Sequence, residues 1–135
     1  MSFIWDDNLA LGVEEIDDQH KEIFVRFDKL SMACQEQHGS DVIQELMDYL
    51  HEYVAHHFAA EEAIMEQVNY PGLTLQREQH EMFRKDLDAL SDESKAGMDL
   101  HKLSLAVDRR LVQWFVLHIR NLDSEMARFV KLQKS

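Results

Sequence analysis

The residues of this chain with the chemistry of metal ligands are histidines and carboxylates at helical spacing. His57 and Glu61 are four residues apart, and so are Gln76 and His80. Side chains at this spacing lie on one face of an α-helix, one turn from each other. Imidazole nitrogens and carboxylate oxygens, without thiolates, suit iron, manganese, zinc or nickel. The spacing therefore predicts a metal site with nitrogen and oxygen ligands, in which Gln76 is the unusual member.

Apolar residues recur at intervals of three and four along most of the chain, the pattern of amphipathic helices. We expect helices over about residues 16–36, 41–67, 72–90 and 98–122, and a short helical tail over about 124–132. The turn NYPG and the polar stretch SDESKAG are expected to connect the second, third and fourth helices. Short connections between long helices imply antiparallel neighbours. The expected fold is all-α: one domain over 1–135, an up-down-up-down four-helix bundle with an N-terminal arm anchored by Trp5.

Each predicted helix turns one histidine toward the core, in an otherwise apolar stripe. His20 and His80 lie near the starts of the first and third helices, and His57 and His118 near the ends of the second and fourth. In an antiparallel bundle these positions share one end. Burying such groups unsatisfied costs roughly 1–3 kcal/mol each, and more for an ionised Glu61, against a total stability of about 5–15 kcal/mol. We therefore expect metal ions to satisfy them.

Asp123 follows His118 by five residues in the segment HIRNLD. Ideal helix geometry turns it about 140° away from His118, so it joins the site only if the helix bends or ends near Asn121. The alternative is that Asp123 caps the tail helix. Two carboxylates among four histidines exceed the needs of one ion and suit two metals bridged by Glu61 and Asp123.

Composition excludes several classes of protein. The formal net charge is −12 over 135 residues, which argues against binding to nucleic acid or anionic membranes. No apolar run approaches the roughly 20 residues that span a bilayer, and the acidic N-terminus lacks the plan of a signal peptide. The one cysteine, Cys34, rules out an internal disulfide framework and fits a reducing cytosol. We expect a cytoplasmic monomer, with Cys34 as a core or boundary residue.

The sequence resembles the bacterial hemerythrins over nearly its whole length. The matching pieces are a tryptophan near the N-terminus, GVEEIDDQHK, HFAAEE, YPG followed by EQHEMF, and WFVLHIRNLD. The resemblance implies a non-haem diiron centre, bridged by carboxylates and an oxo or hydroxo group, that binds O₂ or another small diatomic or anionic ligand. His20 and His57 would hold the five-coordinate iron that receives O₂ in the family, and His80 and His118 the other. Glu61 and Asp123 would bridge the two ions.

Gln76 departs from the family pattern. In the family, the second iron has a third histidine four residues before the one that matches His80. Glutamine offers a neutral carbonyl oxygen, a weaker donor than imidazole, or it hydrogen-bonds a water at that position. We hypothesise that this change speeds the conversion of the oxygen-binding centre to an oxidised one and opens reactivity with peroxide or nitric oxide.

The remaining histidines and aromatic residues have simpler interpretations. His38, His51, His56 and His101 are expected at the surface or in loops, and Glu62 as a solvated charge. Four aromatic residues are expected to pack in the core and to wall an apolar O₂ pocket: Phe24, Phe58, Trp114 and Phe115. Phe115, three residues before His118, is a candidate gate.

Three functions remain open from the sequence. The leading one is a binding protein and not an enzyme, which binds O₂ for storage, delivery or sensing. The second is an enzyme-like diiron protein that acts on peroxide, nitric oxide or ferrous iron, with weak oxidase or peroxidase-like activity. The third is a degenerate family member that binds zinc, one iron or no metal.

Overall fold

The computed structural model describes residues 5–134, and nearly all of them are helical. A short 3₁₀ turn, η1 (Asp7–Leu9), precedes the three long helices α1 (Glu14–Gln35), α2 (Ser40–Gln67) and α3 (Leu73–Lys95). The rest of the chain forms one helical rod from α4 (Leu100–Ala106) through η2 (Val107–Val112), α5 (Gln113–His118) and η3 (Ile119–Asp123) to α6 (Ser124–Lys134). The segments η2 and η3 are π-helical, which means that their turns are one residue wider than α-helical turns.

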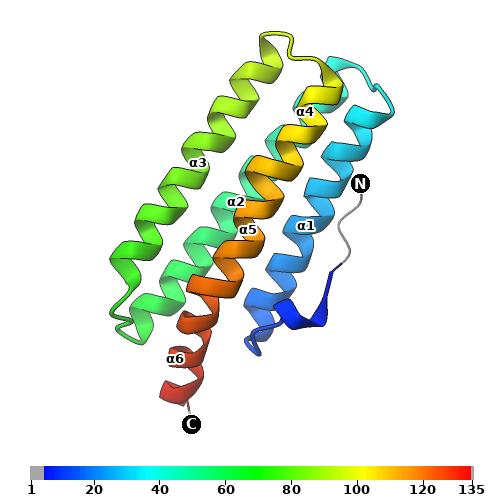
Figure 1. The fold of residues 1–135 in the computed structure, drawn as a ribbon. Helices are drawn as coiled ribbons and strands as arrows, with labels where there is room; N and C mark the ends of the chain where they lie inside the picture. The colour runs from blue at the N-terminus through cyan, green and yellow to red at the C-terminus, as the bar shows by residue number, and fades with distance from the viewer. Residues whose placement is uncertain (1–4, 135) are drawn as a thin grey trace.

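The rod and the three helices lie side by side as an antiparallel bundle, with α6 extending past the ends of the others (Figure 1). Apolar side chains from every helix fill the interior, and Phe27, Phe58, Phe83 and Phe115 are among the largest fully buried ones. Burial of such residues is the dominant favourable contribution to folding. The predicted all-α bundle is confirmed. None of the described helices is long and apolar enough to cross a membrane.

The N-terminal arm is tied to α1. The carboxylate of Asp17 accepts hydrogen bonds from the backbone N–H groups of Leu11, at 2.8 Å, and of Gly12, at 3.1 Å. The ring of Trp5 packs against that of Phe24, with 6.2 Å between centroids. These contacts hold the arm against the first helix, as the sequence predicts.

The third helix is longer than predicted. It continues through SDESK to Lys95 because Leu90 and Ser91 remain buried on its inner face. Two residues after its end comes Gly97, whose φ of +98° is left-handed and therefore suits glycine. The N–H groups of Gly97 and Met98 bond back to the carbonyls of Ser94 and Glu93, which is the Schellman arrangement of a helix end.

The tail helix begins at Ser124, as expected, but it is continuous with the fourth helix. The chain does not leave helical conformation between residues 122 and 124; it passes through the π-helical segment η3 directly into α6. The fourth helix begins at Leu100, where the Asp99 carboxylate accepts a hydrogen bond from the Lys102 N–H at 3.1 Å. The first two helices agree with the prediction to within two residues at each end.

Candidate metal centre

Seven polar side chains meet inside the bundle at the level of η3. They come from five elements, and each is at least 95% buried: His20 of α1, His57 and Glu61 of α2, Gln76 and His80 of α3, His118 of α5 and Asp123 of η3. The amphipathic pattern brings them here, because each occupies a position on the inner face of its helix. The structure thus gathers every predicted ligand residue in one place.

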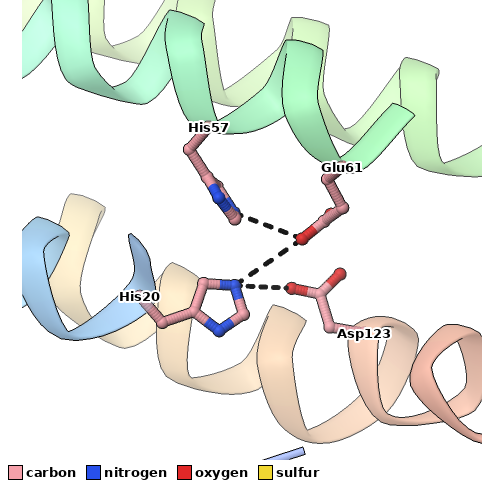
Figure 2. A group of neighbouring side chains, drawn as sticks. All are labelled: His20, His57, Glu61 and Asp123. Atoms are coloured by element: carbon pink, nitrogen blue, oxygen red, sulfur yellow. Dashed lines mark ion pairs between the residues drawn. The ribbon is translucent and has the colours of Figure 1, made fainter. Parts of the chain in front are cut away.

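The first group consists of His20, His57, Glu61 and Asp123. Their ligand atoms all lie within 4.8 Å of one another, close enough to hold one metal ion. His20 Nε2 is 3.2 Å from Asp123 Oδ2 and 3.6 Å from Glu61 Oε2, and His57 Nε2 is 3.2 Å from the same Glu61 oxygen. Figure 2 shows these four side chains converging from three elements.

The second group consists of Glu61, His80 and His118, which could hold another ion. His80 Nε2 lies 3.2 Å from Glu61 Oε1, and His118 Nε2 lies 3.2 Å from Asp123 Oδ1. Each carboxylate therefore turns one oxygen toward the first pair of histidines and the other toward the second pair. This is the arrangement that two bridging carboxylates require.

Asp123 reaches the centre through the π-helical turn. In η3 the backbone hydrogen bonds connect residues five apart, so Asp123 turns back toward the side of the helix that carries His118. The Ser124 hydroxyl donates to the Arg120 carbonyl at 2.6 Å and so satisfies a backbone group next to the widened turn. A bend or an end of the helix was expected near Asn121; the structure instead widens the helix over Ile119–Asp123, which achieves the same rotation.

Several buried polar atoms of this cluster have no hydrogen-bond partner among the described residues. They are both ring nitrogens of His20 and of His118, His57 Nε2, Glu61 Oε2, Gln76 Oε1 and Asp123 Oδ2. Each buried polar atom left without a partner costs about 1–3 kcal/mol, and two adjacent carboxylates also require positive charge nearby. Nitrogen and oxygen donors that share one small space, most of them unsatisfied, fit metal ions of the iron and zinc type.

The titration behaviour of the cluster reflects its two carboxylates. Burial disfavours the charged form of His20, yet the adjacent Asp123 and Glu61 carboxylates outweigh it and raise the pKa of His20 to about 9. Burial also disfavours the charged form of Glu61, but the neighbouring histidines, His57 above all, hold the pKa of that carboxyl well below its usual range. At His57 burial dominates and lowers the pKa. The site therefore stabilises positive charge close to its carboxylates.

Two residues outside the predicted set orient the histidines. His57 Nδ1 donates to Gln19 Oε1 at 2.8 Å, and His80 Nδ1 donates to Glu62 Oε2 at 2.7 Å. These bonds leave Nε2 of each ring free to face the centre, which is the usual role of the outer partners of metal-binding histidines. Arg77 holds Glu62 in turn, with 3.2 Å from Arg77 Nε to Glu62 Oε1. The prediction that Glu62 is a solvated charge was wrong.

Gln76 lies inside the centre and is 99% buried. Its side-chain N–H donates to Asp123 Oδ1 at 3.1 Å, while its carbonyl oxygen has no partner among the described residues. The structure thus shows Gln76 hydrogen-bonded to a candidate ligand, a contact that the sequence did not predict.

The four predicted aromatic residues flank the histidines. Phe58 stacks on His80 with 3.9 Å between ring centroids, and Trp114 stacks on His118 at 4.5 Å. Phe115 lies 6.0 Å from the rings of His20 and Phe24. Phe115 also contacts Phe58 and Trp114, so the four rings form a continuous apolar wall next to the histidines. The other four histidines lie outside the cluster. His38, His56 and His101 are exposed, and the half-buried His51 forms a hydrogen bond with Asp88 at 2.7 Å.

Comparison with known proteins agrees with this geometry. Residues 11–130 match the model of the hemerythrin HHE cation binding domain. The chain belongs to the hemerythrin family. It is 32% identical to a bacteriohemerythrin of Stenotrophomonas maltophilia over 95% of this chain and 81% of that protein. It is 33% identical to a bacteriohemerythrin of Pseudomonas aeruginosa over 90% of this chain and 76% of that one. A hemerythrin-like protein of Naegleria gruberi is 29% identical over 90% of this chain and 87% of its own length.

Proposed function

We propose that this hemerythrin holds two iron ions in its core and binds O₂ there reversibly, for storage, delivery or sensing. The observation that supports the proposal best is the set of unsatisfied nitrogen and oxygen atoms around two carboxylates, Glu61 and Asp123, each turned toward two groups of histidines. A purely structural core would not be expected to retain this many unpaired polar atoms.

Each residue of the cluster has a defined role in this proposal. His20 and His57 would hold one ion, and His80 and His118 the other, with one oxygen of Glu61 and of Asp123 directed to each. When bound, a pair of ferrous ions supplies the electrons that reversible O₂ binding takes up. Gln19 and Glu62 keep the imidazoles of His57 and His80 in the tautomer whose Nε2 faces inward.

The apolar wall would protect the bound gas. Phe24, Phe58 and Phe115 are each at least 98% buried, and Trp114 covers the outer face of His118. A small, neutral molecule such as O₂ enters such surroundings at little cost, whereas water and ions do not. Because irreversible oxidation requires protons, a dry wall favours release of O₂ over its reduction.

Gln76 favours a second candidate function, that of an enzyme-like protein acting on peroxide, nitric oxide or ferrous iron. Gln76 donates a hydrogen bond to Asp123, and an amide oxygen is a weaker ligand than an imidazole nitrogen. We therefore propose that the centre converts to an oxidised form faster than one with histidine at position 76.

Anaerobic loading with ferrous iron, followed by exposure to O₂ and then to argon, tests these proposals. Reversible binding predicts about two irons per chain and recovery of O₂ under argon, with slower oxidation in Gln76→His. Sustained consumption of peroxide or nitric oxide would favour the enzyme-like function. If wild type and Gln76→His oxidise at the same rate, the role proposed for Gln76 is wrong.

A further inference from the structure

We infer that the two metal positions are unequal: an ion between His20 and His57 is held tightly, and an ion between His80 and His118 is held weakly and exchanges. This inference rests on the proposed function, because it assumes that the cluster binds metal. It predicts a stable form of the protein with one ion per chain whenever metal is scarce.

The first position has the more complete set of ligands. Two histidines and two carboxylates from three elements direct their ligand atoms to a space within which all of them lie less than 4.8 Å apart. All four side chains are fully buried. Two imidazole nitrogens and two anionic carboxylate oxygens balance the charge of a divalent ion and give it four protein ligands.

The second position has only three residues at comparable spacing, Glu61, His80 and His118. Gln76 lies on the same side of the cluster, but in this structure it turns its N–H toward Asp123. Its carbonyl oxygen has no partner among the described residues, but a neutral amide oxygen is a weaker ligand than an imidazole nitrogen. Gln76 therefore adds less to this position than a histidine would.

The same hydrogen bond also weakens Asp123 as a ligand on this side. Asp123 Oδ1 already accepts the Gln76 N–H at 3.1 Å and lies 3.2 Å from His118 Nε2. Its other oxygen, Oδ2, faces His20 at 3.2 Å and accepts no hydrogen bond from the described residues. The more available oxygen of Asp123 thus belongs to the first position.

Repulsion between two cations would separate two binding steps even if the positions were identical. A two-step titration is therefore insufficient, and the decisive observation is which position fills first. Iron-free protein should be crystallised under argon with one equivalent of ferrous iron and examined by anomalous diffraction at the iron edge. We expect the density to lie between His20 and His57, with little between His80 and His118.

A titration with ferrous iron under argon, in competition with a chelator, gives the affinities of both steps. We expect Gln76→His to tighten the second binding step by roughly tenfold or more and to leave the first step unchanged. Tenfold is the lower limit of the affinity that a metal site loses with an outer hydrogen-bond partner, and a direct ligand should contribute at least as much. Gln113→His, at an exposed position of α5, is the matched control for an added histidine and should change neither step.

The outcomes separate the inference from the proposal beneath it. The inference would be overturned by iron density that appears first between His80 and His118, or equally at both positions. An unchanged affinity of the second step in a folded Gln76→His protein would overturn it too. Each of these results would leave a metal-binding centre in place. If Gln76→His does not fold, the wild-type diffraction result decides alone. If neither step binds iron in wild type, the proposed function itself fails.

Discussion

The side-chain amide of Gln76 donates a hydrogen bond to Asp123 Oδ1 across 3.1 Å and so joins α3 to the π-helical turn η3. Both residues are buried, and both face the same cluster of imidazoles. The bond places a neutral amide against a carboxylate that is directed at both metal positions. The faster oxidation and the weaker second metal position that we propose for this hemerythrin both depend on that contact.

Glu62 is predicted to support metal binding through His80. Glu62→Ala removes the acceptor of the His80 Nδ1 hydrogen bond, so we expect roughly 10–100-fold weaker binding of iron at the position of His80. Competition with a chelator under argon measures the change. Glu66→Ala is the matched control, because Glu66 also pairs with Arg77 but is exposed and, among the described residues, does not hydrogen-bond His80. Equal losses in the two variants would contradict an orienting role for Glu62.

Phe115 is predicted to hold the apolar wall together. Phe115→Ala leaves a cavity among Phe24, Phe58 and Phe83, and should lower the free energy of unfolding of the iron-free protein by about 3–5 kcal/mol. Phe115→Leu retains most of the volume and should cost less. Urea denaturation measures both. In the iron-loaded protein Phe115→Ala should also oxidise faster; a stable variant with unchanged oxidation would show that Phe115 does not limit access.

Metal removal is predicted to destabilise the fold. An ion that binds the folded chain alone raises its stability by RT ln(1 + [metal]/Kd), about 2.7 kcal/mol at a hundredfold excess over Kd. The melting temperature should therefore fall when a chelator is added to the iron-loaded protein. In Glu61→Ala, which lacks a ligand common to both positions, the chelator should have much less effect. An identical melting temperature with and without metal in wild type would contradict the prediction.

Cys34 is predicted to be unreactive in the folded protein. It is 99% buried, and burial raises the pKa of its thiol to about 11. Because the folded pKa lies above the ordinary value of about 8.5, the contribution of Cys34 to stability is complete below pH 8.5 and is lost as pH rises from there through about 11. A thiol reagent at pH 8 should label Cys34 only after unfolding, and Cys34→Ala should lose less stability over that pH range. Rapid labelling of the native chain would refute the assignment.

Much of the centre was predictable because its ligands interrupt apolar stripes. His57 and Glu61 occupy inner positions of one helix, and the antiparallel order places them level with His20 and His80. Asp123 was harder to predict, because a π-helical turn has no simple sequence signature and ideal α-helical geometry points its side chain elsewhere.

The outer partners of the histidines escaped sequence analysis for a different reason. Gln19 and Glu62 act on histidines of neighbouring helices, and the spacing of residues within one helix carries no information about such contacts. The end of α3 was misplaced because SDESK is polar, although Leu90 and Ser91 still face the core.

The most direct test of the account is the metal content of protein purified from iron-supplemented cells and of iron-free protein reloaded under argon. We predict close to two irons per chain when iron is in excess, falling to one when it is limiting, with the bundle folded throughout. Folded protein that retains no iron under either condition would contradict the claim that these six ligands form a metal centre.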